Sequence, residues 1–213
     1  GTSAQNADAA QTVRWANWSL YLDFNNKTKK YDTLEGFKKK TGINATYTEA
    51  VDDNDTFTAK VTPQLKLKKD IGYDVTCLTE WMASRWLHSG FLTKLDPKKV
   101  PNKKNVLPSL ADRPFDKGRV YTLPYAGIIG GLAWSKKALP QGLKTVDDLF
   151  AKGNKGRIEV LSEMRDTIGI IMMWQGVDIS KNFTEAQFMN AVDFLQKKIK
   201  DGYIRQIKGQ SYS

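Results

Sequence analysis

The chain has 213 residues, a formal net charge of +10 and a hydrophobic fraction of 40%. This length and composition are typical of a folded protein with one large or two small domains, and they exclude a disordered chain. No apolar run approaches the roughly 20 residues of a membrane-spanning helix. The single cysteine, Cys77, cannot form a disulfide within the chain. With only one histidine, His88, the sequence does not favour an all-protein zinc site, and we expect no metal and no cofactor.

The chain begins with twelve small or polar residues, and we expect residues 1–12 to be an expression tag and a linker. A strand is predicted at 13–15. A helix follows at 33–41, with Asp32 as its cap and Gly42 at its end, and the next strand is at 43–47.

The strand–helix pattern then repeats. Another helix is predicted with Asp55 as its cap and Pro63 as its kink or its end. It is followed by a strand at 75–78 and a helix that stops near Gly90. Strand–helix units in succession predict an α/β fold with a parallel sheet. Residues 96–116 are rich in Pro, Asn and Lys and are predicted to be mostly loop.

The most apolar segment of the sequence is 120–134. Pro124 interrupts a first extended run, Gly127 permits a bend, and a second strand-like run follows at 127–134. Two short strands broken in this way fit a chain that leaves one folding unit and enters another. An ordinary core strand with a turn fits the local pattern equally well.

The second half of the chain carries the same pattern with fewer strands. Thr145 caps a short helix, a strand is predicted at 157–161, and a helix follows at 166–175. Thr184 and Gln187 form a capping box for the last helix. Because a doubly wound unit normally has more strands, we expect the second unit to be incomplete.

Aromatic side chains follow two of the predicted strands. Trp18 and Tyr21 come after the first strand, and Trp81 comes after the strand at 75–78. In open α/β sheets, ligands bind outside the carboxyl ends of the strands. Aromatic rings at that edge can stack on a ligand or hold a cation over their faces. Rings that close the edge of the core are the alternative.

Glu163 and Asp166 follow the predicted strand at 157–161 with a spacing of one helical turn. At the start of a helix, the dipole favours the ionised form of both carboxylates. Two ionised carboxylates in a crevice suit a ligand with ammonium groups. Simple helix capping, with Arg165 as a neighbour, is the alternative.

The sequence does not favour an enzyme. His88 lies in a predicted helix without a nucleophile motif, and the glycines at 127, 130 and 131 lack the spacing of a dinucleotide-binding loop. Lysines cluster at 38–40, 66–69, 98–104 and 197–200. Acidic residues are interspersed, so we expect solvated faces and no nucleic-acid partner. A basic surface protein that binds an anionic polymer, with salt-dependent retention, stays open as an alternative.

Four short motifs occur in order along the chain. Residues 17–21 read Asn-Trp-Ser-Leu-Tyr, 37–43 join a predicted helix to a predicted strand, 73–75 precede Thr-x-Trp at 79–81, and Leu-Pro-Tyr stands at 123–125 with a glycine at 127. Together they resemble the spermidine/putrescine-binding proteins of bacterial ABC importers, in which the last motif forms a crossing between lobes. Each motif is short, but their order and spacing are specific, and the match runs from about residue 13 to 207.

The resemblance implies an α/β, two-lobe periplasmic-binding-protein-like fold of type II, with lobes at 13–124 and 125–213. The second lobe would be incomplete, since the return crossing is missing. It also implies a monomer exported to the periplasm or the cell surface, lipid-anchored or free, which closes its lobes around a polyamine and delivers it to an ABC permease in the membrane.

The resemblance also assigns residues. The implied ligand contacts are Trp18, Ser19, Tyr21, Thr79, Trp81, Glu163 and Asp166. The implied hinge residues are Pro124, Tyr125 and Gly127. Leu20 departs from the family pattern, which has an acidic residue there. A non-cationic solute such as a sugar is therefore the alternative ligand.

Overall fold

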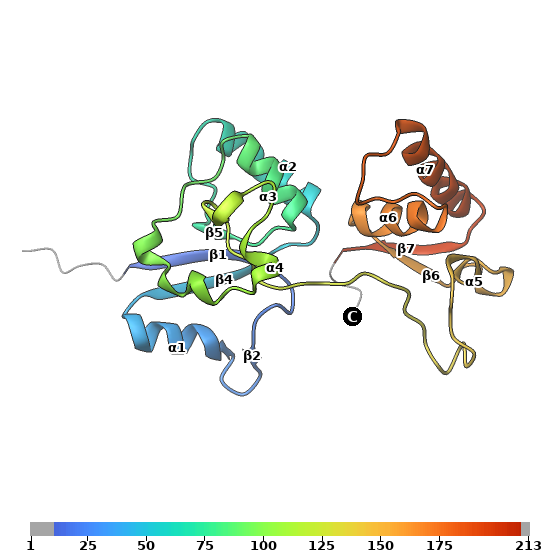
Figure 1. Cartoon of the computed structure of the whole chain (residues 1–213). Helices are drawn as coiled ribbons and strands as arrows, with labels where there is room; N and C mark the ends of the chain where they lie inside the picture. Colours follow the sequence, from blue (N-terminus) through green and yellow to red (C-terminus); the bar gives the residue numbers. More distant parts are fainter. Residues whose placement is uncertain (1–10, 210–213) are drawn as a thin grey trace, which may run out of the picture. The chain divides into compact units, whose positions relative to one another are not determined.

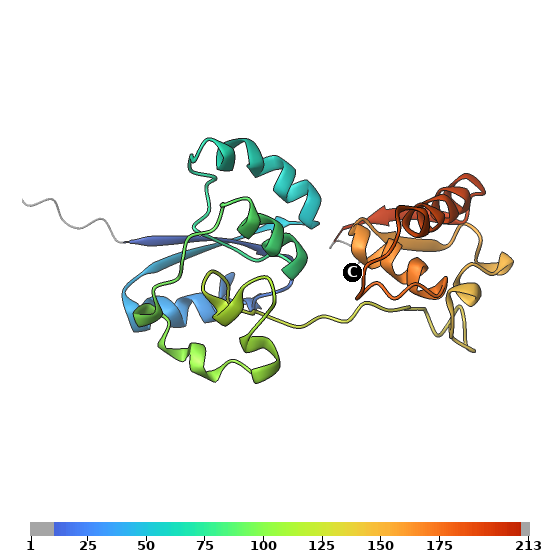
Figure 2. The same ribbon diagram turned by 45° about the horizontal axis from the view of Figure 1, so that its top comes forward.

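The computed structural model describes residues 11–209. The chain divides into two compact units, Gly1–Gly127 and Ile128–Ser213, and each is described by itself (Figures 1 and 2). The boundary falls after Gly127, the glycine at which the sequence predicts a bend. Of the expected tag and linker, residues 1–10 lie outside the described residues, whereas Thr12 is already the first residue of a strand.

A three-stranded parallel sheet forms the centre of the first unit. Its order is β4–β1–β5, with β1 at Thr12–Trp18, β4 at Asn44–Val51 and β5 at Val75–Thr76. In the register, Trp15 of β1 lies opposite Tyr47 of β4. Because the three strands are parallel, the loops that follow them leave the same edge of the sheet.

Helices cover both faces of this sheet. α1 (Asp32–Thr41) lies on one face, and α2 (Asn54–Lys66) and α3 (Glu80–His88) lie on the other (Figures 1 and 2). α1 contributes no fully buried residue, so the core lies on the side of α2 and α3. It consists of Ala16, Trp18, Val51, Phe57, Val61, Met82 and Trp86. Apolar burial of this kind is the main stabilising contribution to the unit.

Short elements complete the first unit. β2 (Phe24–Asn25) pairs with β3 (Lys30–Tyr31) in an antiparallel hairpin. The segment predicted to be mostly loop contains α4 (Pro108–Ala111). Three short 3-10 helices precede or follow α4 in the chain, at Pro97–Lys99, Pro101–Asn105 and Lys117–Arg119.

Two of the predicted helix caps are wrong. Asp32 is the first residue of α1, and the Thr33 N–H donates instead to the Asp23 carboxylate, at 3.1 and 3.2 Å from its two oxygens. α2 is capped by Asp53, whose side chain accepts from the first turn, and not by Asp55. Asp53 precedes α2 in an extended backbone conformation that lets its side chain accept from the first turn, whereas the acceptor at the start of α1 comes from a residue distant in sequence.

Of the two outcomes predicted for Pro63, a kink or the end of the helix, the second is wrong. Pro63 lies inside α2, which continues to Lys66. A proline leaves the carbonyl four residues earlier without its helical N–H donor. In the same turn, the Thr62 hydroxyl donates to the Thr58 carbonyl at 2.6 Å. The loss is thus confined to one hydrogen bond near the end of the helix, and the helix continues past it.

No strand forms in residues 120–134 of the described chain. Ile128 and Ile129 are 70% and 97% exposed, whereas a strand within a sheet would bury part of each side chain. A strand needs a hydrogen-bonded neighbour, and none of the described strands pairs with this segment. The two strands predicted on either side of Pro124 and Gly127 are therefore wrong, and the segment is irregular.

The chain before this segment is fixed by Asp116 and Arg119, which we call the Asp116–Arg119 clamp. The Asp116 carboxylate accepts from three successive backbone N–H groups, at 2.8 to 3.1 Å, the last being that of Thr122. The Arg119 guanidinium is 2% exposed. It donates to the Leu110 carbonyl, the Thr122 hydroxyl and, at 2.6 Å, Glu80 Oε1 of α3. The clamp thus joins the start of α3 to the beginning of the irregular segment 120–134.

The second unit contains a two-stranded parallel sheet and three α-helices among its described residues. In chain order its elements are α5 (Val146–Leu149), a 3-10 turn (Lys152–Asn154), β6 (Ile158–Leu161), α6 (Met164–Trp174), α7 (Glu185–Lys200) and β7 (Ile204–Lys208). The predicted caps are confirmed, since Thr145 and Thr184 each complete a capping box. Ile168, Ile171, Met172 and Ala191 form the core between α6 and α7.

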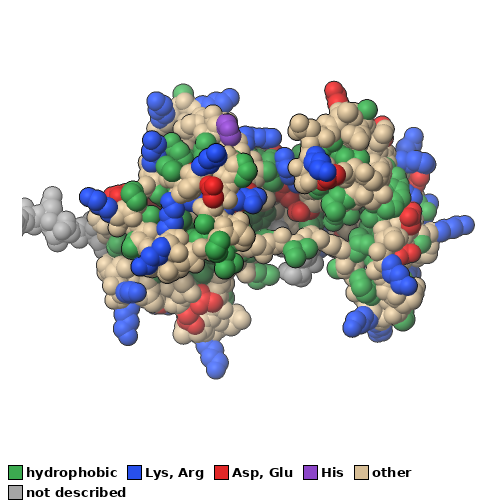
Figure 3. Space-filling view, in the orientation of Figure 1, with side chains coloured by type: hydrophobic (Ala, Val, Ile, Leu, Met, Phe, Trp, Pro, Cys, Tyr) green, Lys and Arg blue, Asp and Glu red, His purple; other side chains and the backbone are tan. Residues whose placement is uncertain are grey.

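Charged side chains are spread over the visible surface. Figure 3 shows Lys and Arg on both units with Asp and Glu between them, rather than one continuous basic patch on this face. Within residues 11–209, no helix is long and apolar enough to cross a membrane. The same residues contain no group of three or more His, Cys, Asp or Glu that could hold a metal ion.

Candidate functional site

The loops at the carboxyl edge of the first sheet carry five of the predicted ligand residues. Trp18 ends β1, with Ser19 and Tyr21 in the turn after it. Thr79 and Trp81 follow β5, at the start of α3. The parallel sheet thus brings the two sequence motifs to one edge, as the strand pattern predicted.

Trp18 is a core residue in this arrangement. Its side chain is 5% exposed and belongs to the buried cluster between the sheet and α2 and α3. The Tyr47 hydroxyl donates to its carbonyl at 2.8 Å. This burial favours the alternative in which the ring closes the edge of the core. Trp81 is only half-buried, and the Arg85 guanidinium lies over its ring at 5.3 Å.

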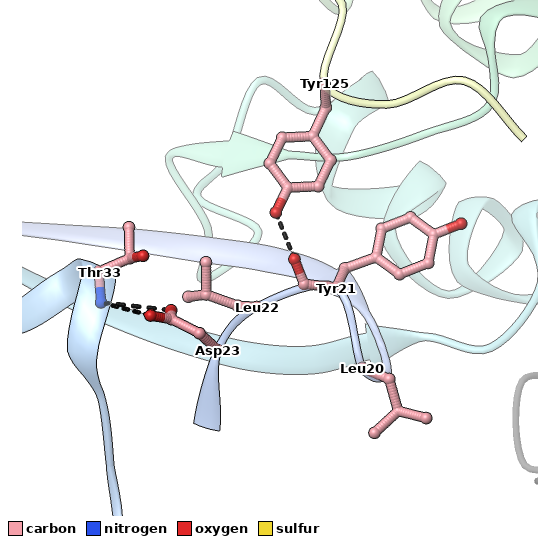
Figure 4. Close-up of a pocket in the computed structure, with 6 residues that line it drawn as sticks. All are labelled: Leu20, Tyr21, Leu22, Asp23, Thr33 and Tyr125. Atoms are coloured by element: carbon pink, nitrogen blue, oxygen red, sulfur yellow. Dashed lines mark hydrogen bonds between the residues drawn. The ribbon is translucent and has the colours of Figure 1, made fainter. Parts of the chain in front are cut away.

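Tyr21 and Tyr125 form the aromatic part of an open pocket. Their rings stack with centroids 6.1 Å apart, and the Tyr125 hydroxyl donates to the Tyr21 carbonyl (Figure 4). The pocket has a volume of about 470 Å³ and is lined by Leu20, Tyr21, Leu22, Asp23, Thr33 and Tyr125. Partial burial raises the pKa of Tyr125 above its ordinary value, so its hydroxyl stays protonated and remains a donor at neutral pH.

Asn54 was missed by the sequence analysis, although it orients a predicted ligand residue. Its side chain is fully buried. Its Oδ1 accepts from the Thr79 N–H at 3.0 Å, and its Nδ2 donates to the Thr79 hydroxyl at 2.8 Å. A polar residue just after β4, the neighbour of β1, was the signal that could have revealed it.

Replacing Asn54 by alanine is expected to lower the free energy of unfolding by about 1–3 kcal/mol, because the N–H of Thr79, the N-cap residue of α3, loses its acceptor. Urea unfolding of both proteins measures the difference. The matched control is Asn26→Ala, at an exposed position in the β2–β3 turn, which should change stability by at most about 0.5 kcal/mol. Equal effects of the two variants would contradict the role of Asn54.

In the second unit, Glu163 and Asp166 lie within one turn at the start of α6. Glu163 occupies the N-cap position, is 7% exposed and makes no capping hydrogen bond with its side chain. Asp166 is in the first helical turn, and its burial raises the pKa of the carboxyl group above the ordinary value. Gly130 lies beside it, since a Cβ atom there would be 3.5 Å from Asp166 Oδ1. The predicted spacing therefore does place both acids at a helix start.

The predicted hinge residues lie in the irregular segment. Tyr125 is bonded to the Tyr21 carbonyl, as described, and Gly127 is the last residue of the first unit. Pro124 is half-buried. Their role as a hinge stays a prediction.

Residues 32–212 match the family described as "Bacterial extracellular solute-binding protein". The chain belongs to this family. Among its curated relatives is the spermidine/putrescine-binding periplasmic protein of Escherichia coli, 27% identical over 200 residues that cover 93% of this chain and 53% of that protein. Another is the putrescine/cadaverine-binding protein of Pseudomonas aeruginosa, 27% identical over 86% of this chain and 50% of the relative. The chain thus spans about half the length of the curated relatives it matches.

Solved structures of solute-binding proteins share the fold. A putative spermidine/putrescine ABC transporter from Listeria monocytogenes gives a TM-score of 0.75 at 22% identity, over 94% of this chain and 57% of that chain. The Tp0655 lipoprotein of Treponema pallidum gives a TM-score of 0.76 at 21% identity, over 95% of this chain and 59% of that chain. The predicted family and periplasmic-binding-protein-like α/β fold are confirmed. Because the chain covers little more than half of each of these structures, the comparison fits the predicted incomplete second lobe.

Proposed function

We propose that this solute-binding protein captures a polyamine or a similar small cation outside the cytoplasmic membrane and delivers it to an ABC permease, without catalysis. The pair of acids at the start of α6 carries the proposal, because a partly buried carboxylate with a raised pKa gains most from a cationic partner. The relatives that bind spermidine, putrescine or cadaverine support the same ligand class. In this proposal the protein acts as a monomer, and its lobes, divided near residue 125, close around the ligand.

Calorimetric titration of the full-length protein with spermidine and putrescine tests the ligand class. Binding of either amine supports the proposal. Absence of heat and of thermal stabilisation at millimolar amine would refute the polyamine assignment while leaving the fold unaffected.

The affinity for polyamine is expected to depend on pH through Asp166. Its folded-state pKa lies above the ordinary value, and a bound ammonium group favours the ionised carboxylate, so ligand binding releases a proton. Affinity should therefore be full above the raised pKa and should fall as the pH is lowered through it. Asp166→Asn should weaken binding by about 1.5–3 kcal/mol at neutral pH and remove this part of the pH dependence.

Titrations at a series of pH values, with Asp178→Asn as the control, measure this effect. Asp178 is an exposed aspartate of the same unit whose carboxylate bonds locally to Ser180 and Lys181. The control should keep both the affinity and the pH profile of the wild type. An unchanged profile for Asp166→Asn would show that Asp166 does not meet the cation.

A non-cationic solute is the second candidate, favoured by Leu20. This residue is 75% exposed on the wall of the Tyr21–Tyr125 pocket, where the family pattern has an acid. For such a ligand, replacing Glu163 and Asp166 by alanine should leave affinity almost unchanged. If the replacement instead weakened binding by about 1.5–3 kcal/mol, a non-cationic solute would be excluded.

A further inference from the structure

The Tyr21–Tyr125 pocket carries one charged side chain. Of the six residues that line it, Asp23 is the one with a carboxylate side chain, and no lining residue is basic. The remaining wall consists of the two tyrosine rings, two leucines and Thr33. In a chain with a formal net charge of +10, this pocket is a local site of negative charge. Figure 4 shows the Asp23 carboxylate directed toward the Thr33 N–H and the Tyr125 hydroxyl directed toward the Tyr21 carbonyl.

The Asp23 carboxylate has spare acceptor capacity. Within residues 11–209, its side chain takes a hydrogen bond from one group, the Thr33 N–H, and forms no ion pair with Lys or Arg. An ionised carboxylate offers about four acceptor positions. By contrast, Asp116 accepts from three backbone N–H groups and the Thr122 hydroxyl. Asp23 is therefore anchored by α1 without an ion-pair partner among the described residues.

The charge of Asp23 reaches the aromatic part of the pocket. Burial is the main cause of the raised pKa of Tyr125, and electrostatic interactions with Cys77 and Asp23 add to it. Glu49, the other carboxylate near this turn, differs from Asp23. It does not line the pocket, and its Oε1 accepts from the Leu20 N–H at 3.3 Å. Asp23 is thus the acid that lines the pocket together with the two tyrosine rings.

A carboxylate beside two aromatic rings is an arrangement that selects an ammonium group. The carboxylate supplies a charge-assisted hydrogen bond, and the rings attract a cation or pack against its methylene groups. We infer that Asp23 determines specificity in this pocket by pairing with one ammonium group of the ligand. It supplies the negative charge that Leu20, three residues earlier, does not provide. The inference rests on the proposed function and adds a residue that the first motif does not contain.

Asp23→Asn separates this role from helix capping. Asparagine still accepts a hydrogen bond from the Thr33 N–H and is as good a cap as aspartate, so the thermal midpoint should stay nearly unchanged. Titration of the full-length protein with putrescine and spermidine should show an affinity about 10- to 100-fold lower than that of the wild type. The matched control is Asp96→Asn, because Asp96 also accepts a backbone N–H at a helix start and does not line the pocket.

A second variant tests the exchange of charge between positions 20 and 23. Adding Leu20→Glu to Asp23→Asn returns one carboxylate to the same pocket wall and should recover most of the lost affinity. Wild-type affinity in Asp23→Asn, an equal loss in Asp96→Asn, or no recovery in the double variant would each overturn the inference. These outcomes require a wild type that binds polyamine. If the wild type does not bind polyamine, the proposed function itself fails. If the wild type binds and Asp23→Asn binds equally well, only the inference about Asp23 fails.

Discussion

Arg119→Ala is expected to lower the free energy of unfolding by about 3–5 kcal/mol. The guanidinium is 2% exposed and satisfies three acceptors, the Glu80 carboxylate, the Leu110 carbonyl and the Thr122 hydroxyl. Alanine would leave these acceptors without their donor in a partly buried site, and each unsatisfied group costs about 1–3 kcal/mol. Urea unfolding followed by tryptophan fluorescence measures the change.

Arg113→Ala is the matched control. Arg113 contacts the other oxygen of the same Glu80 carboxylate, at 2.9 Å, but its side chain is 40% exposed. A solvated ion pair of this kind contributes about 0–1 kcal/mol. If the two variants were equally stable, the stabilisation would come from the charge of Glu80 alone rather than from the buried clamp.

Trp18→Ala is expected to cost a similar amount, about 3–5 kcal/mol, because it removes a large ring from the core between the sheet and α2 and α3. If Trp18 were mainly a ligand contact, the variant would instead lose affinity with little loss of stability. Unfolding curves in the absence of ligand therefore decide between the two roles.

Tyr21→Ala serves as the control for Trp18→Ala. Tyr21 lies in the same turn and only partly packs against the core cluster, and it lines the pocket. Its replacement should cost clearly less stability than that of Trp18. The reverse order would contradict the assignment of Trp18 to the core.

Much of the fold could be predicted because its signals are local. The capping boxes at Thr145 and Thr184 depend on residues three positions apart, so the sequence alone places the starts of α5 and α7. Gly42 at the end of α1 adopts φ +74°, the conformation that its position predicted. The parallel strands follow from the same alternation of strand and helix patterns.

The errors arise where a distant partner decides. Whether residues 120–134 form strands depends on a neighbouring strand, which no local pattern shows. The cap of α1 comes from Asp23, on the far side of the β2–β3 hairpin, and not from the adjacent Asp32. Arg119 and Asn54 were missed for the same reason, because their partners Glu80 and Thr79 lie far away in sequence.

The candidate site divides along the same line. Glu163 and Asp166 could be placed at a helix start from their spacing, and the motif residues after β1 and β5 from the parallel sheet. The sequence left open whether Trp18 contacts ligand or fills the core, because that depends on the helices packed against it. The charge of Asp23 in the pocket could not be anticipated, since its place there depends on how the turn after β1 meets α1 and Tyr125.

The Asp116–Arg119 clamp also has a mechanical consequence. Hydrogen bonds to Asp116 fix the backbone as far as Thr122, and Arg119 ties that stretch to α3. The backbone hydrogen bonds of this stretch therefore end at Thr122, and the Tyr125 hydroxyl adds one more link to the first unit through the Tyr21 carbonyl. If the predicted hinge at 124–127 operates, a glycine placed before residue 122 should loosen it less than one placed after that residue.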